Sequence, residues 1–274
     1  MSGGQLSPED LRSDWDGPQL GRGRIGPTLR TVDGVALATR CWMPEAPPPA
    51  TVVICHGLTG NKDDPKVVAL AERLYDHGCQ VVTYDSRGHG SSGGTCTLGH
   101  LERLDVAAVV KWAGASGSQL VLVGASMGAL AALGYAAVDP SLTGVVAISS
   151  PGDWRLPFHF RSLLTAGLAR TRAGRRWARR KMNVRIGPWS APESARNLLP
   201  AVGCPVVVVH GSADPIIPRR FSLANGLREG PLRELVVVPD MGHAFDPIGL
   251  TPICEATNRL IRRRDDWATP IAGA

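Results

Sequence analysis

Short apolar runs, several of them rich in β-branched residues, recur along most of the chain. They lie at Thr51–Cys55, Gln80–Tyr84, Leu120–Val123, Gly144–Ser149, Pro205–Val209 and Glu234–Val238. Continuous apolar runs of this length are typical of strands that are buried on both faces. The pattern therefore predicts a mostly parallel sheet in the centre of the protein.

Helical patterns separate these runs. The predicted helices span about Asp64–His77, His100–Ala113, Ser126–Val138, Pro218–Arg228 and Pro252–Arg263. Strands that alternate with helices indicate an α/β fold with helices on both faces of the sheet. Ahead of them, two alternating runs around Asp33-Gly34 predict a hairpin over Leu29–Trp42, which would add antiparallel edge strands.

One interval breaks the alternation of strands and helices. More than fifty residues separate Ser149 from Pro205, which is longer than a single crossover needs. We assign residues 153–197 to an inserted cap and residues 29–152 and 198–268 to the α/β core. Residues 1–28 are rich in glycine and polar residues, and we expect them to form a loosely ordered N-terminal arm.

The positive charge of the chain is concentrated in this insert. The 274 residues carry a formal net charge of +6, and the insert holds eleven basic and two acidic side chains, which leaves −3 for the rest. Arg172, Arg176 and Arg180 would form one positive stripe on a helix. Three interpretations stay open: a solvated face, a surface for an anionic substrate, or attraction to an anionic membrane. We do not expect nucleic acid as a partner, because no known binding module accompanies the charge.

Other patterns limit the environment and the cofactors. The six cysteines form no CxxC pair, which favours reduced thiols in a core. The first thirty residues lack the apolar segment of a signal peptide, and no run approaches 18 apolar residues, so we expect a cytoplasmic protein without stable membrane insertion. The histidines are scattered singly, so no metal site is predicted. Residues 88–93 satisfy GxGxxG, but six residues intervene before the next predicted helix, and we expect no cofactor.

A GxSxG motif stands between a predicted strand and an alanine-rich predicted helix. Residues 124–128 read GASMG, with Ser126 at the centre. A serine on such a tight turn has a strained backbone, and only small residues two positions to either side avoid a clash. The turn would present the Ser126 hydroxyl beyond the carboxyl edge of the sheet. Ser126 is therefore a candidate nucleophile.

Two further residues supply what a nucleophilic serine requires. Such a serine needs a base, and the base needs a carboxylate that holds its tautomer. His243 follows the last predicted strand, and Asp214 follows the strand before it. Both would lie at the same sheet edge as Ser126, in the chain order Ser, Asp, His. We expect these three residues to form a catalytic triad.

Stabilisation of an oxyanion requires a pair of N–H donors. Residues 56–60 read HGLTG and directly follow the first strand of the parallel sheet. The backbone amides of Leu58 and Met127 are the candidate donors. His56 is a candidate substrate contact, although a structural role in shaping this loop is the simpler interpretation.

At these positions the sequence resembles the α/β-hydrolase family, from about Leu29 to Trp267. HGLTG is similar to the oxyanion loop of that family, GASMG to its nucleophile elbow, and YDSRGHGSS to the loop after its next strand. The resemblance implies the α/β-hydrolase fold, with a mostly parallel sheet of eight-stranded type and a small inserted helical cap. Some members place the acid after the preceding strand, where this chain has Asp153, so two acids stay open and Asp214 is preferred.

The narrower resemblance is to the esterase and acyl-aminoacyl-peptidase-like branches. It implies a carboxylesterase-like serine hydrolase that cleaves a small-molecule ester or thioester, with an anionic substrate as one option. A peptidase or amidase for short or N-acylated peptides is the first alternative, and a non-catalytic ligand-binding protein with the same fold is the second. The candidate substrate contacts in the cap are Trp154, Phe158, Phe160 and Trp189.

Overall fold

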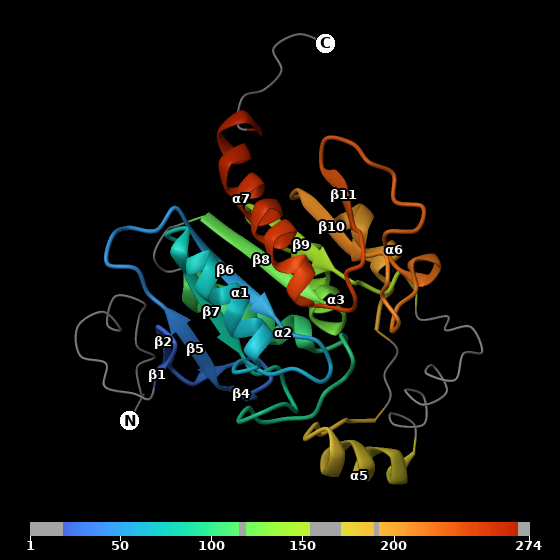
Figure 1. Cartoon of the computed structure of the whole chain (residues 1–274). Coiled ribbons are helices and arrows are strands. Elements are labelled where there is room, and N and C mark those ends of the chain that lie inside the picture. The colour runs from blue at the N-terminus through green and yellow to red at the C-terminus, as the bar shows by residue number, and fades with distance from the viewer. Residues whose placement is uncertain (1–18, 115–118, 154–170, 189–191, 268–274) are drawn as a thin grey trace.

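A central sheet with helices on both faces forms the body of the protein (Figure 1). The computed structural model describes residues 19–114, 119–153, 171–188 and 192–267. The strands are β1 (Gln19–Leu20), β2 (Gly23–Ile25), β3 (Leu29–Arg30), β4 (Ala36–Leu37), β5 (Thr39–Trp42), β6 (Ala50–Cys55), β7 (Gln80–Tyr84), β8 (Gln119–Ala125), β9 (Gly144–Ile148), β10 (Val206–Gly211) and β11 (Arg233–Val238). The helices are α1 (Pro65–Asp76), α2 (Glu102–Ala113), α3 (Met127–Ala136), α5 (Arg172–Lys181), α6 (Ala195–Leu198) and α7 (Leu250–Trp267), and the 3-10 turns are η2 (Leu199–Ala201), η3 (Arg219–Phe221) and η4 (Pro247–Gly249).

The sheet has nine strands in the described residues, in the order β1-β2-β5-β7-β6-β8-β9-β10-β11. Strands β7, β6, β8, β9, β10 and β11 run parallel to one another, whereas β1, β2 and β5 are antiparallel at one edge. The parallel strands all end at one edge of the sheet, so the loops that follow them meet there. The predicted mostly parallel α/β fold is confirmed, with β1 as one short strand beyond the expected eight.

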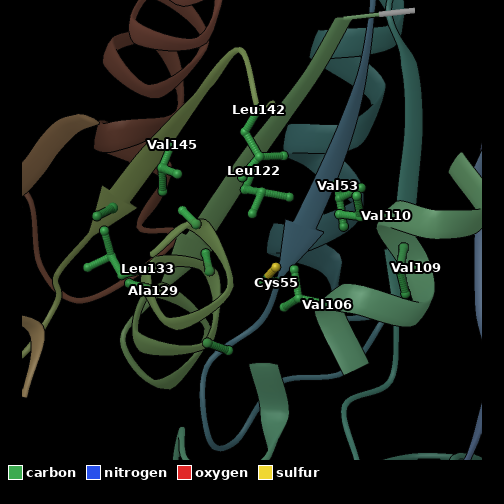
Figure 2. Close-up of a cluster of buried hydrophobic side chains, with 14 of the residues drawn as sticks. Val53, Cys55, Val106, Val109, Val110, Leu122, Ala129, Leu133, Leu142 and Val145 are labelled. Atoms are coloured by element: carbon green, nitrogen blue, oxygen red, sulfur yellow. The ribbon is translucent and has the colours of Figure 1, made fainter. Parts of the chain in front are cut away.

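Successive residues of the central strands face opposite layers, because side chains alternate along a strand. Val53 and Cys55 of β6 pack in the cluster that contains α2 and α3, as Figure 2 shows, whereas Val52 and Ile54 pack in the cluster that contains α1 and α7. The continuous apolar runs of the sequence follow from this double burial. All six cysteines are unpaired and buried, as predicted.

Two sequence predictions about local structure are wrong. The segment Pro218–Arg228 contains only the short turn η3 and no helix. Leu223 donates its amide to Ser150 O at 2.9 Å, and Gly226 has a φ of +73°, so the backbone of this segment turns to bond a neighbouring loop. The expected loose arm is wrong for residues 19–25, which form β1 and β2 and extend the antiparallel edge.

The predicted hairpin forms, but as a small separate pair. Strands β3 and β4 are antiparallel, with Leu29 opposite Leu37, while β5 joins the main sheet. The predicted helices near α1, α2, α3 and α7 are confirmed, with ends that shift by a few residues. Within the described residues, no helix has the length and apolar character that crossing a membrane requires.

Part of the insert is described, including α5 and the segment after it. Residues Trp154, Phe158, Phe160 and Trp189, the candidate substrate contacts, lie outside the described residues. The segment after α5 is fastened to the loop after β7: Cys96 donates its amide to Arg185 O at 2.8 Å, and Gly187 donates to Cys96 O at 2.9 Å. The end of the insert is therefore fixed to the body beside the edge where the parallel strands end.

Candidate active site

Ser126 lies on a strained turn between β8 and α3. Its φ of 54° and ψ of −113° fall in a region that side chains other than glycine rarely adopt, at a cost of about 1–3 kcal/mol. A Cβ atom at Gly124 would lie 2.5 Å from Gly128 O, and one at Gly128 would clash with Cys55 O. A side chain at Gly124 would therefore collide with the first residues of α3, and one at Gly128 with the end of β6. The side chain of Ser126 stays partly exposed.

Asp214 and His243 come together at the ends of β10 and β11. Nδ1 of His243 donates a hydrogen bond to Oδ2 of Asp214 at 2.8 Å. The other oxygen, Oδ1, accepts the amides of Ile216 and Ile217, each at 2.8 Å. With Nδ1 as the donor, Nε2 of His243 is the nitrogen that can accept a proton. This is the tautomer that a general base next to a serine requires.

The electrostatics favour an ionised Asp214. Burial of this carboxyl group by itself raises its pKa, but the hydrogen bonds from His243 and from the two amides outweigh that effect and hold the pKa of Asp214 below its usual value. The Asp214 side chain has no exposed surface, whereas that of His243 is partly exposed. The buried carboxylate therefore keeps its charge, and the imidazole keeps one side accessible.

Contacts at the end of β9 hold both halves of the site. Ser126 donates its amide to Ile148 O at 2.9 Å, and Ala244 donates its amide to the Ser149 hydroxyl at 3.1 Å. Ser149 is fully buried and has a φ of 45°. Ser126 itself and Ala244, the residue after His243, are thus hydrogen-bonded to consecutive residues at the end of one strand. No local pattern marks Ser149, because its partner Ala244 is distant along the chain.

The candidate oxyanion loop, residues 56–60, approaches Ser126 closely. A Cβ atom at Gly57 would lie 3.5 Å from Cβ of Ser126 and from Ala125 O, so the backbone of this loop faces Ser126. Met127 is the first residue of α3, and its amide has no acceptor within its own helix. The amide of Leu58 has no acceptor among the described residues. Both predicted donors therefore have amides available for a ligand.

Comparison with known proteins decides the family. The profile described as the alpha/beta hydrolase family matches residues 52–249, which contain Ser126, Asp214 and His243. The chain belongs to the alpha/beta hydrolase family. A curated relative, the uncharacterized protein YqkD of Bacillus subtilis (strain 168), is 40% identical over 93 residues. The match covers 32% of this chain and only 30% of that protein.

Solved structures share the fold of this alpha/beta hydrolase over nearly its whole length. The esterase Pf2001 of Pyrococcus furiosus is 22% identical with a TM-score of 0.64, and the match covers 95% of this chain and 96% of that chain. XC6422 of Xanthomonas campestris, described as a serine hydrolase without lid, is 24% identical with a TM-score of 0.61, covering 90% of this chain and 96% of that one. At these identities the likeness shows the fold alone.

His56 of the hydrolase has contacts that suit a structural residue. Its Nδ1 donates to Gly57 O at 2.7 Å, and its Nε2 accepts the Ser86 amide at 2.9 Å, so both nitrogens are occupied. Burial, with a smaller effect from His89, lowers the pKa of His56 to about 3. The ring is therefore neutral, and its two hydrogen bonds suit a residue that shapes the loop of residues 56–60.

His89 is a residue that sequence reasoning missed. Its Nε2 donates to Leu58 O at 2.7 Å, and its ring lies edge-on to His56 with centroids 4.8 Å apart. The side chain is buried. His89 thus holds the carbonyl of the same residue whose amide is a candidate oxyanion donor. Its position in the glycine-rich loop after β7 was the one available signal.

Asp153, the other candidate acid, is engaged elsewhere. Its Oδ2 forms an ion pair with Nε of Arg196 at 3.0 Å, and about half of its side-chain surface is exposed. Asp214, by contrast, is buried and bonded to His243. The geometry therefore favours Asp214 as the partner of the imidazole.

Proposed function

We propose that this alpha/beta hydrolase is a serine hydrolase that cleaves a carboxylic ester or thioester through an acyl-enzyme on Ser126. The observation that carries the proposal is the hydrogen bond between His243 and buried Asp214, which leaves Nε2 of His243 as the free base at the edge where Ser126 lies. The solved structure from Pyrococcus furiosus, which shares the fold, is described as an esterase, and the proposal assigns the same reaction class to this chain.

The first half of the reaction forms the acyl-enzyme. Nε2 of His243 takes the proton of the Ser126 hydroxyl as Oγ bonds to the substrate carbonyl carbon, and the carbonyl π electrons move to oxygen. The amides of Leu58 and Met127 stabilise that oxyanion. When it collapses, the bond from carbon to the leaving oxygen or sulfur breaks, and the leaving group takes the proton from His243.

The second half releases the acid. Water gives a proton to His243 and attacks the acyl carbon, and the oxyanion forms again between the same two amides. The bond between the acyl carbon and Oγ then breaks, and Ser126 recovers its proton from His243. Asp214 stays ionised throughout and stabilises the imidazolium in each half.

The decisive experiment compares two serine variants on a short-chain aryl ester. Ser126→Ala is expected to lower kcat roughly 10⁴-fold or more. Ser91→Ala is the matched control, because Ser91 is exposed and its contact with Asp85 is made by the backbone amide, which the substitution keeps. Full activity of Ser126→Ala, or equal losses in both variants, would refute the mechanism.

Two further measurements separate the alternatives. A fluorophosphonate probe should label wild type and not Ser126→Ala; an unlabelled wild type would favour a non-catalytic ligand-binding protein. A panel of neutral esters, thioesters and N-acylated peptide amides then ranks the substrates. Higher kcat/KM on the amides would favour a peptidase, because an amine is a poorer leaving group and needs closer protonation by His243.

A further inference from the structure

Helix α5 of the insert is basic over most of its surface. Its ten residues include six basic side chains and no acidic one. All but Arg175 of these basic residues are exposed. Those five have no acidic partner among the described residues. The helix therefore presents concentrated positive charge to its surroundings. Trp177, on the same helix, is 46% exposed.

The inner side of α5 is fastened next to the candidate active site. Ala178 is fully buried in a small apolar cluster that also contains Cys96 and Met127, and Leu58 packs against that cluster. Met127 and Leu58 are the two residues proposed as oxyanion donors. Figure 1 shows α5 beyond the carboxyl ends of the central strands, apart from the main helical layers. The helix thus packs in the same cluster as Met127, the residue that follows Ser126.

We propose that α5 docks this protein on the surface of an anionic phospholipid membrane. The basic side chains extend along about 15 Å of helix and around a wide arc, so they do not converge on one phosphate. A field of headgroups matches such a spread of charge, whereas a single soluble anion needs a convergent pocket. A site built for one anion would contain at least one buried cation, and all five of these are exposed.

Two observations favour a membrane over nucleic acid. A half-exposed tryptophan on a basic helix suits the headgroup region, where one part of the ring is apolar and the other can hydrogen-bond. The charge is also segregated, because the chain outside residues 153–197 has a net charge of −3. That asymmetry turns the α5 side toward an anionic surface, with the proposed active site next to it.

The test is binding to vesicles, measured by co-sedimentation. Vesicles of equal parts phosphatidylglycerol and phosphatidylcholine are expected to bind the full-length protein, and pure phosphatidylcholine vesicles to bind far less. Replacing Arg172, Arg176 and Arg180 together by Gln should lower the partition coefficient roughly 100-fold. The same three positions changed to Lys should keep most of the binding, since the charge is retained.

A matched control removes equal charge elsewhere. Arg103, Lys111 and Arg228 are exposed and lie outside the insert, and their combined replacement by Gln should lower binding several-fold less than the α5 triple change. Trp177→Ala should weaken binding of the anionic vesicles by a smaller factor than the triple change. The α5 triple variant, the control triple variant and Trp177→Ala should all leave turnover of a short, water-soluble ester unchanged.

Several results would overturn the proposal. Equal binding to both vesicle types, or equal losses in the α5 and control variants, would show that α5 is not the docking surface. Tighter binding of duplex DNA or of a soluble acyl thioester that carries phosphates than of the vesicles, lost in the α5 triple variant, would assign the helix to that ligand instead. Docking does not depend on the proposed reaction: Ser126→Ala should bind vesicles like wild type, so loss of activity and loss of docking are distinguishable.

Discussion

The loops that follow β6 and β7 and the helix α5 both reach Met127 and Leu58, but they use charge in opposite ways. In the loops, charged side chains are buried and paired: Arg87 forms an ion pair with Asp105 at 2.8 Å, and Lys62 contacts Asp85 at 3.3 Å. On α5 the exposed cations have no acidic partner among the described residues. The charged pairs in the loops hold the loop backbone in place, whereas the charges on α5 remain available to another molecule.

Charged side chains therefore have two different roles around this site. The buried pairs and the histidines hold the candidate oxyanion loop in a single shape, because breaking any of them leaves a polar group unsatisfied in the interior. The basic helix contributes little to that shape, since its exposed charges are already solvated. Changes in the loops should therefore alter catalysis and stability, and changes on the outer face of α5 should alter neither.

The largest expected effect distinguishes an acid of the core from an acid of the insert. Asp214→Asn should lower kcat about 10⁴-fold on an aryl ester, because the amide favours the wrong tautomer of His243. Asp153→Asn is the matched change at the start of the insert, and it should leave kcat within about twofold, because Asp153 bonds Arg196 at the surface. A larger loss for Asp153→Asn would place the acid in the insert.

Next in size is the difference in stability between a buried and an exposed arginine. Arg87→Met should lower the free energy of unfolding by about 3–5 kcal/mol, because it leaves the buried Asp105 carboxyl group without its ion-pair partner. Arg180→Met on α5 should change it by less than about 0.5 kcal/mol. Urea denaturation measures both free energies of unfolding. Similar losses in the two variants would show that charges in the loops and on α5 contribute equally to stability.

A third effect depends on pH and concerns His56. Its pKa of about 3 in the folded protein lies below that of an unfolded histidine, so the unfolded state binds more protons as the pH falls below about 6.5. The contribution of His56 to the free energy of unfolding is therefore present at neutral pH and falls by roughly 2 kcal/mol between pH 7 and pH 5. His56→Asn should reduce that loss in urea denaturation, whereas the Gln variant of Arg172, Arg176 and Arg180 should keep it.

The smallest effect concerns the position of Leu58. His89→Ala should lower kcat about tenfold and leave KM nearly unchanged, because the candidate oxyanion loop loses one buried hydrogen bond to Leu58 O. His89→Gln, which keeps a donor, should recover part of the rate. Arg176→Gln on α5 is the control, and a comparable fall in its kcat would show that α5 also positions the site.

The sequence was most informative where the structure depends on near neighbours. The turn at Ser126 needs small residues two positions away, so GASMG could be recognised directly. The buried strands were visible because continuous apolar runs follow from burial on both faces. Placing Asp214 and His243 after neighbouring strands was enough to predict that they share an edge, and they are hydrogen-bonded there.

Features that depend on distant partners could not be predicted. Residues 19–25 become strands because they pair along β5, and their own sequence shows no sustained period. The segment Pro218–Arg228 has apolar residues but forms no helix, since Leu223 bonds Ser150 O across the structure. His89 acts on Leu58, far away in sequence, and nothing local marks that contact.

His243 follows β11, which forms the outer edge of the sheet and, among the described strands, pairs with β10 alone. Most residues of β11 are only half-buried, so this strand should open at lower free energy than the central ones. Each opening would carry the imidazole away from Ser126 while the central strands keep their structure. During heating, hydrolytic activity should therefore decay before circular dichroism detects unfolding, and a preparation with an intact spectrum can already be inactive.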